Sequence, residues 1–287
     1  MQKNTNVSGF ASVDMSAFKK YKFPIPPLEI QQEIVKILDA FTELNTELNT
    51  ELKARKKQYE YYQNMLLDFK DIHQNHKDAK ERLAHKPYPK RLKTLLQTLA
   101  PKGVEFRKLG EVLEYDQPNQ YCVTSKEFDK SYPTPVLTAG KTFILGYTNE
   151  KDNIYQASKN APVIIFDDFT TATQWVDFPF KVKSSAMKIL FSKNPTINIR
   201  FIFFYMQTIP YNIGGEHARH WISRYSQLEV PIPPLEIQQE IVKILDQFSI
   251  LTTDLLAGIP AEIEARKKQY EYYREKLLTF KPLQNKE

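Results

Sequence analysis

The string PIPPLEIQQEIVKILD stands at residues 24–39 and stands again, without a single change, at residues 231–246. A second string, ARKKQYEYY, follows at residues 54–62 and recurs at residues 265–273. Identity over sixteen residues does not arise by chance. Solenoid repeats recur every ~20 to 50 residues in three or more copies, so two long copies around a unique block have another origin. The sequence therefore predicts a duplicated module on either side of a separate domain.

Each copy has the pattern of a long helix. Pro26 and Pro27 suit a helix start, because a proline in the first turn gives up an N–H that has no partner within the helix. Apolar and aromatic residues then recur every seven residues from Ile34 to Phe69, with Arg55 at one of these positions, as they do along a coiled-coil seam. About 43 residues at 1.5 Å each make a rod of about 65 Å. Such a rod cannot bury its apolar stripe alone, so we expect the second copy to be its partner.

The two copies differ in their middle sections. Gly258, Ile259 and Pro260 interrupt the pattern in the second copy, which predicts a kink or a short break there. In the first copy, residues 42–53 are three successive tetrapeptides that begin with Thr-Glu-Leu. One such unit lengthens a helix by about 6 Å and rotates the part beyond it by about 40°. This section is therefore expected to act as a spacer.

Composition restricts the class of protein. The chain has 287 residues, of which 41% are hydrophobic and one is a cysteine, so it can build a core and has no disulfide framework. Its sequence shows neither an apolar run long enough for a membrane span nor a secretory leader, which predicts a cytoplasmic protein that does not bind membranes. The net charge of +6 favours an anionic partner without naming it.

The basic residues are concentrated in two places. Residues 70–103 hold nine basic and three acidic side chains, so we expect residues 71–103 to be a basic linker, mobile or weakly helical. Residues 104–180 hold seven basic and eleven acidic side chains, whereas residues 181–230 hold seven basic and two acidic ones. One half of the middle domain is therefore expected to be positive.

The middle block, residues 104–230, has the pattern of a globular α+β domain. Short apolar runs at residues 135–138, 142–145, 162–166 and 187–191 predict strands, and residues 201–208 predict a buried helix. The expected order is a first long helix at 24–70, the linker at 71–103, this domain, a second long helix at 231–281 and a tail at 282–287.

The repeated strings, the Thr-Glu-Leu spacer and the central stretches TPVLTAGKTFILGYT and PVIIFDDFTT together resemble the specificity subunit of type I restriction-modification enzymes, over essentially the whole chain. The resemblance implies target-recognition domains that alternate with two conserved helical regions. It implies that these helices form an antiparallel coiled coil, and that each domain reads half of a bipartite DNA site. It also implies that a modification (methyltransferase) subunit and a restriction (endonuclease) subunit dock on this scaffold and carry the chemistry. The chain itself is then a non-catalytic subunit without a cofactor.

The chain departs from that pattern because it has one recognition domain instead of two. Residues 1–23 stand where the end of the recognition domain stands in the second copy, so they resemble the tail of an upstream domain. The chain is thus similar to a half-subunit or a truncated form. One possibility is a monomer whose own helices pair. The other is a homodimer through the helices, which would read an inverted, palindromic site.

DNA-binding side chains are expected mainly from the positive half of the domain. Glutamine can pair with adenine through two hydrogen bonds, lysine and arginine bind guanine or phosphate, and aromatic side chains and histidine can contact sugars. The side chains expected to bind DNA are Tyr147, Gln174, Trp175, Lys181, Lys183, Arg219, His220 and Arg224. The alternative for each cation is a solvated surface charge, and for Trp175 and Trp221 it is a core or edge aromatic.

Several patterns typical of enzymes are incomplete. Gly140, Lys141 and Thr142 resemble the end of a phosphate loop, but Pro135 stands where the loop needs glycine. Asp167 and Asp168 lack the third carboxylate and the lysine of a magnesium nuclease, which favours an acidic turn. The histidine pairs 73/76 and 217/220 have zinc-compatible spacing but no second ligand pair, since the cysteine stands alone. We therefore expect no metal site and no catalysis.

Two alternatives come from other classes of protein. The chain could be a stand-alone coiled-coil scaffold or a regulatory module that binds DNA or protein, or more remotely a methyltransferase or nuclease in its own right. The Arg-Lys-Lys runs at residues 55–57 and 266–268 are either solvated charge or a docking surface for a modification subunit.

Overall fold

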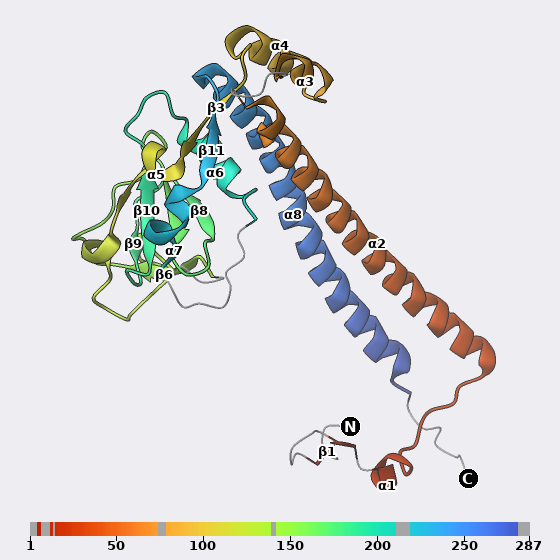
Figure 1. Cartoon of the computed structure of the whole chain (residues 1–287). Helices are drawn as coiled ribbons and strands as arrows, with labels where there is room; N and C mark the ends of the chain where they lie inside the picture. Colours follow the sequence, from red (N-terminus) through yellow and green to blue (C-terminus); the bar gives the residue numbers. More distant parts are fainter. Residues whose placement is uncertain are drawn as a thin grey trace, which may run out of the picture. The chain divides into compact units, whose positions relative to one another are not determined.

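The computed structural model describes residues 5–6, 12–13, 15–73, 79–138, 142–210 and 219–280 (Figure 1). The chain forms two compact units, one of residues 1–55 with 253–287 and one of residues 56–252, and each is described by itself. Two long helices, α2 (Leu28–Leu67) and α8 (Leu235–Leu278), contribute to both units. Among the described helices, none combines the length and the apolar character that a membrane span requires. The mixed class of helix and sheet is as predicted.

Both long helices begin at the same leucine of the repeated string. The Pro27 carbonyl accepts hydrogen bonds from the N–H groups of Ile30 (3.0 Å) and Gln31 (3.1 Å). The Pro234 carbonyl accepts the equivalent bonds from Ile237 (2.9 Å) and Gln238 (3.2 Å). The prolines therefore precede the first turn, where their missing N–H costs nothing.

Helix α8 contains Pro260 and continues through it. Of the two predicted alternatives, the short break is wrong, and the kink stays a prediction. A proline removes one hydrogen bond and crowds the preceding turn, but the bonds before and after it remain, and they suffice to carry this helix on.

In the smaller unit, α2 and α8 contact each other through aromatic rings. The Phe41 ring centroid lies 5.7 Å from that of Tyr273 and 6.4 Å from that of Tyr270. Earlier on α2, Ile34 lines a groove together with Leu277 from later on α8, so the two helices run in opposite directions in this unit. A continuous coiled-coil seam along their whole length stays a prediction. This unit also contains a two-stranded pair, β1 (Thr5–Asn6) with β2 (Ser12–Val13), and the short helix α1 (Met15–Phe18).

Side-chain donors in the spacer section of α2 bond to carbonyls of the same helix. The hydroxyl of Thr42 donates to the Leu38 carbonyl (3.0 Å), and that of Thr46 donates to the Thr42 carbonyl (2.9 Å). Asn45 and Asn49 donate in the same way to carbonyls four residues earlier. These donors therefore need no second chain, which suits a section that acts through its length.

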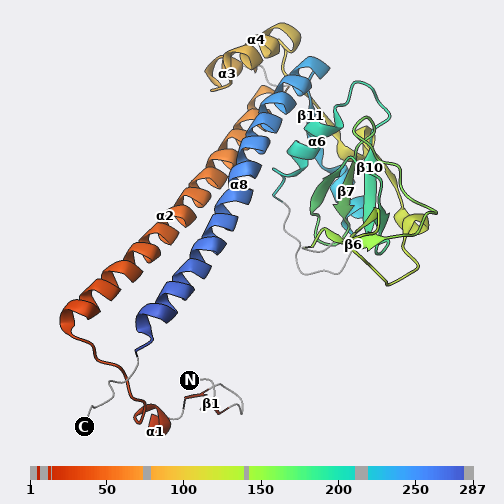
Figure 2. The same cartoon turned by 180° about the vertical axis from the view of Figure 1, so that it is seen from behind.

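The larger unit is built on a four-stranded antiparallel sheet with the order β4-β10-β7-β8. Figure 2 shows its two central strands, β7 and β10, side by side. Its strands are β4 (Glu114–Asp116), β10 (Met187–Phe191), β7 (Val163–Asp167) and β8 (Thr173–Val176). A second sheet has the order β6-β5-β9, from β6 (Ile144–Thr148), β5 (Thr134–Leu137) and β9 (Lys181–Val182). A third pairs β11 (Glu229–Ile232) with β3 (Glu105–Lys108). The shorter helical elements here are η2 (Lys70–Ile72), α5 (Leu109–Val112), η3 (Pro118–Tyr121), α7 (His220–Ser223) and η4 (Tyr225–Gln227).

Strand β7 shows why an unbroken apolar run in this sequence forms a strand. All five of its residues are buried. Ile164 and Phe166 belong to the larger core cluster, and Val163 and Ile165 belong to the smaller one. Successive side chains of a strand point to opposite faces, so both faces of this strand are covered. The four predicted strands are confirmed as β5, β6, β7 and β10, with small shifts at their ends.

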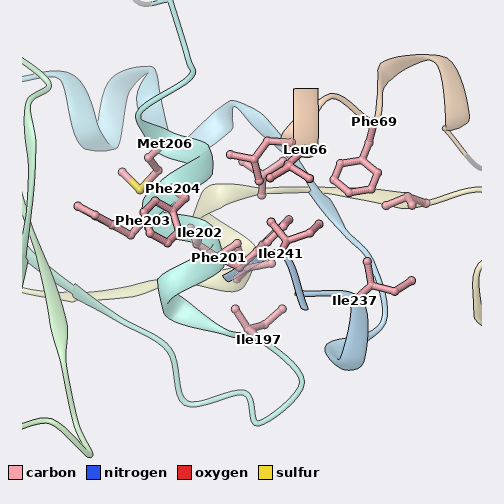
Figure 3. Packing of buried hydrophobic residues seen from close by; sticks show 14 of the residues in the cluster. Leu66, Phe69, Ile197, Phe201, Ile202, Phe203, Phe204, Met206, Ile237 and Ile241 are labelled. Carbon is pink, nitrogen blue, oxygen red and sulfur yellow. The ribbon is translucent and has the colours of Figure 1, made fainter. Parts of the chain in front are cut away.

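The predicted buried helix is confirmed as α6 (Ile199–Met206). Its first turn is capped by Asn198, whose side chain accepts from the N–H groups of Arg200 (3.0 Å) and Phe201 (3.3 Å). Figure 3 shows α6 packed among apolar side chains from both long helices. The labelled residues from the long helices and the segment after α2 are Leu66, Phe69, Ile237 and Ile241.

The segment expected to be a basic linker, mobile or weakly helical, is helical and contributes to the core. It forms α3 (Ala79–His85) and α4 (Lys90–Leu99). Leu92 and Leu96 are fully buried, and Leu83 and Tyr88 are nearly so. The basic side chains lie between these apolar positions, so α3 and α4 are amphipathic. Their many basic residues made the apolar, buried positions hard to recognise in the sequence. His76 lies outside the described residues.

Candidate nucleic-acid interface

The side chains predicted to bind DNA differ in their exposure. Gln174, Lys183, Arg219 and Arg224 are exposed, and Tyr147 and Trp175 are half-buried. Lys181 and His220 are each 1% exposed. The predicted set therefore contains four exposed, two half-buried and two buried side chains.

Lys181 is held inside the domain by carboxylates. Its ammonium lies 2.8 Å from Glu150 Oε2 and donates to the Asp152 carbonyl at 2.9 Å. Burial by itself raises the pKa of Glu150, but the hydrogen bonds from Lys181, Ser125 and Thr124 lower it to about 2. The ion pair with Glu150 gives the Lys181 charge a partner within the fold, and binding of DNA by Lys181 stays a prediction.

His220 and Trp175 are also used by the fold. His220 begins α7, and its N–H donates to the Asp168 carbonyl at 2.9 Å. The His220 side chain is buried at this point, and binding of DNA by His220 stays a prediction. The Trp175 ring packs 5.7 Å from the Phe203 ring, and the Arg200 guanidinium lies 4.5 Å over it. The alternative of an edge aromatic therefore describes Trp175 better.

The positive half of the domain is less positive outside than its composition indicates. Four of its seven cations form ion pairs: Lys181 with Glu150, Lys188 with Asp168, Lys193 with Glu114 and Arg200 with Asp246. The other three, Lys183, Arg219 and Arg224, are exposed. The outward charge of this half is therefore concentrated on those three side chains.

Two of these cations, Lys183 and Arg219, lie in segments that backbone hydrogen bonds connect to one turn. The Asp168 N–H donates to the Ala186 carbonyl (3.3 Å), which links the turn after β7 to the loop after β9. The Asp168 carbonyl accepts from His220, which links the same turn to the start of α7. We call the exposed residues of these three segments the loop edge; they are Phe169, Thr170, Lys183, Ser184 and Arg219.

Phe169 and the hydroxyl residues of the loop edge were not predicted from the sequence. Phe169 is 36% exposed although it is a large apolar residue. Its position between two aspartates and two threonines was a usable signal, because an aromatic side chain in a polar turn has no strand or helix face to bury it. Exposed aromatic and hydroxyl groups beside cations are typical of surfaces that bind nucleic acids.

Gln174 and Tyr147 lie outside the loop edge. Gln174 lies on the edge strand β8, which follows the turn that carries Phe169. In the register of the sheet it is opposite Ile165 of β7. Tyr147 lies on β6 and lines an open groove of about 560 Å³ together with Pro135 and Phe178. No contact in the structure brings Tyr147 together with the loop edge among the described residues.

The two adjacent aspartates form a turn, as the sequence favoured. Asp167 accepts from the Phe169 N–H (2.9 Å), the Thr170 N–H (3.2 Å) and the Thr170 hydroxyl (2.6 Å). Asp168 is fully buried. The described part of the chain contains no group of three His, Cys, Asp or Glu side chains placed to hold a metal ion. Gly140, Lys141 and His217 lie outside the described residues.

Sequence comparison now decides the family. Residues 1–57 and 101–265 match the model of the type I restriction modification DNA specificity domain. The chain belongs to this family. The match contains both copies of the repeated string and the whole middle domain. It leaves out residues 58–100, which hold the end of α2 and helices α3 and α4.

Individual members of the specificity family support the assignment. The chain is 54% identical over 188 residues to the specificity subunit of the type I restriction enzyme EcoR124I/EcoR124II of Escherichia coli, covering 62% of this chain and 45% of that protein. It is 30% identical over 288 residues to a putative type I restriction enzyme specificity subunit of Haemophilus influenzae, covering 94% of this chain and 66% of that one. The chain thus spans less than two thirds of the length of both relatives.

A solved structure agrees with the specificity-family fold. The S subunit of a type I restriction-modification system from M. genitalium superposes with a TM-score of 0.57 at 14% sequence identity. The alignment covers 98% of this chain and 69% of that one. At this identity the likeness concerns the fold alone.

Proposed function

We propose that this chain is a DNA-specificity subunit of a type I restriction-modification complex. Its middle domain, residues 104–230, reads one half of a bipartite DNA site. Its long helices act as a spacer and as a docking scaffold for a modification subunit, to which a restriction subunit is added. Methyl transfer and cleavage then belong to those cytoplasmic partners, and this chain has no catalysis and no cofactor of its own. The family match over both helix starts and the middle domain carries the proposal.

The loop edge is the surface that we propose for DNA. Lys183 and Arg219 bring two cations to neighbouring segments, and cations that neutralise phosphates supply most of the affinity for a duplex. The two acidic residues of the adjoining turn, Asp167 and Asp168, are 5% and 0% exposed, so their carboxylates are not presented at the surface of the loop edge. Gln174, exposed on the adjoining strand, is the proposed reader of a base edge. A stand-alone scaffold would leave this surface without a role.

The proposal is tested by expressing the chain with a type I modification subunit and mapping the methylated DNA sequence. A defined methylated word supports it. Methylation without a common word, or none with an active partner, contradicts it. Incubation of the isolated chain with DNA and a labelled methyl donor is expected to give no transfer.

The loop edge is tested by replacing Lys183 and Arg219 together with alanine and measuring duplex binding over a range of salt. Each phosphate contact contributes a slope of about 0.9 in the plot of log affinity against log salt. The double variant is therefore expected to lower the slope by about 1.8. Lys159→Ala, at an exposed lysine in another turn, is the matched control and should keep the full slope. An unchanged slope in the double variant would show that the loop edge is not the DNA-binding surface.

The two copies of the repeated string differ in what covers them. Gln238 is fully buried, accepts from the Asn198 N–H (2.8 Å) and donates to the carbonyls of Thr196 (3.0 Å) and Pro233 (2.7 Å). Its counterpart in the first copy, Gln31, is exposed and keeps the equivalent of the last bond, to the Pro26 carbonyl (2.7 Å). We propose that the first copy is the seat of a second recognition domain and that residues 1–23 are the tail of such a domain.

A further inference from the structure

Helix α7 begins at a residue that is unable to cap it. Its N-cap is Arg219, with φ −79° and ψ 124°, and no side-chain bond is made from that position. The first N–H groups of a helix lack partners within the helix, and a Ser, Thr, Asp or Asn side chain at the N-cap normally accepts from them. A guanidinium has donors only. The first N–H groups of α7 therefore need an acceptor from elsewhere in the fold.

Asp168 is that acceptor. Its carbonyl accepts from the N–H of His220 at 2.9 Å, and its Oδ1 accepts from the N–H of Trp221 at 2.9 Å. The two residues bonded through the carboxylate are 53 positions apart in the sequence, so the cap comes from a different element. Asp168 has no exposed surface, and Trp221 is 1% exposed. The start of α7 is thus fixed from inside the domain.

The charge of this buried carboxylate is balanced by a buried cation. The Lys188 ammonium lies 3.6 Å from Asp168 Oδ2 and also bonds to Gln117 Oε1. Gln117 in turn donates to the Ser185 carbonyl at 3.0 Å, in the loop that carries Lys183. A buried ion pair gives little net stability compared with apolar side chains of the same size. The consequence of this one is geometric, because it joins the segments of the loop edge.

We propose that Asp168 is the positioning residue of the loop edge, and that it caps α7 from within the domain so that an arginine can occupy the N-cap position at the surface. The two adjacent aspartates then have different structural roles. Asp167 closes the turn that carries Phe169, and Asp168 fixes the helix that carries Arg219. This inference rests on the proposed function of the loop edge in binding DNA.

The cap is tested without DNA, by amide hydrogen exchange of the full chain. Asp168→Ala removes the acceptor of the Trp221 N–H, so that amide is expected to exchange at least about tenfold faster. Asp168→Asn keeps an acceptor oxygen, and combined with Lys188→Met it also leaves no unpaired buried charge. That pair is expected to keep the Trp221 amide protected even if the alanine variant does not fold. Glu127→Ala, at an exposed acid of the same domain, is the control. Unchanged exchange at Trp221 in a folded Asp168→Ala chain overturns the proposal, and so does lost protection in the neutral pair.

The positioning role is tested by a double-variant cycle on duplex affinity. If Asp168 acts through Arg219, then Asp168→Ala and Arg219→Ala weaken binding by the same factor, and the double variant is no weaker than either. Factors that multiply would mean that Asp168 only stabilises the domain, and they would overturn the proposal. An Arg219→Ala chain with full affinity, while Trp221 exchange responds to Asp168→Ala, overturns the DNA-positioning role and leaves a cap of α7. A wild-type chain that binds no duplex, alone or with a modification subunit, is instead a failure of the proposed function, and the exchange result would stand.

Discussion

Glu150 bonds to several segments of the middle domain and pairs with a buried lysine. One of its oxygens accepts from the Thr124 N–H, the Thr124 hydroxyl and the Ser125 N–H, at 2.8 to 2.9 Å. The other pairs with the buried Lys181. One carboxylate thus holds a loop before β5, its own segment after β6 and the strand β9 together.

This arrangement predicts how stability changes with acid. The pKa of Glu150 is lowered from 4.5 to about 2 in the fold, so its contribution is fully present above pH 4.5 and is lost as the pH falls toward 2. Thermal unfolding measured between pH 6 and pH 2 should show this loss. Glu150→Gln should flatten the profile in that window. A variant with the same acid sensitivity as the wild type would contradict the prediction.

Lys181 provides a second prediction at this scale. Replacing it with methionine leaves the Glu150 carboxylate without its cation in a largely buried place, so we expect a loss of about 3 kcal/mol in the free energy of unfolding. Lys183→Met, two residues later and exposed, is the matched control and should change stability by less than about 0.5 kcal/mol. Chemical denaturation of both variants measures the difference. Equal effects would mean that the ion pair is not formed.

The contrast between these two lysines shows what the sequence could reveal of the site. Both stand in the same run, KVKSS, and nothing local separates a paired cation from a solvated one. The partner of Lys181 is Glu150, 31 positions earlier and in the segment after β6. Only tertiary structure brings the two together, so the predicted set mixed Lys183 and Arg219 with the buried Lys181 and His220. Residue type alone therefore does not separate the exposed members of the predicted set from the buried ones.

Among the elements, the long helices and central strands were predictable because their signals are local. The prolines of the repeated string set both helix starts, and an apolar run covered on both faces set β7. For helices α3 and α4 the sequence left a weakly helical segment as one alternative, but their buried face was not predicted, because their basic residues outnumber the leucines that face the core. The charge of a segment describes its solvent face, whereas its fold depends on the spacing of its apolar residues.

The repeated string offers a matched pair of substitutions at the scale of elements. Gln238→Ala removes a buried side chain that bonds the start of α6 to α8, and we expect it to cost about 2 kcal/mol. Gln31→Ala makes the same change in the same sixteen residues, but on an exposed face, and should cost less than about 0.5 kcal/mol. Urea unfolding of both variants tests this difference. Equal losses would show that the first copy is covered too.

At the scale of the whole molecule, the proposed function gives residues 1–287 two seats, one at each copy of the repeated string, and one middle domain, residues 104–230, to fill them. The seat in α8 is filled by the chain's own α6, through Gln238 and through the Arg200–Asp246 ion pair at 2.8 Å. Any number of identical chains has twice as many seats as domains. A homodimer would bring two recognition domains together for a palindromic site, yet it would leave one seat in each chain without a domain. Filling that seat requires a recognition domain that is not residues 104–230.

The first seat exposes an apolar surface, which predicts the behaviour of the isolated chain. Ile25 is 84% exposed, Leu28 62% and Ile30 46%, whereas Ile237, the counterpart of Ile30, is fully buried. Contiguous exposed apolar residues mark interaction sites. We therefore expect the chain to associate at micromolar concentration, with a mass above 33.6 kDa in sedimentation. Ile30→Lys should return it to that mass with its fold intact, while Ile237→Lys should unfold the domain because it buries an unpaired charge. A wild-type chain that stays at 33.6 kDa up to high concentration would show that this face does not bind itself, and would leave a second recognition domain as its proposed occupant.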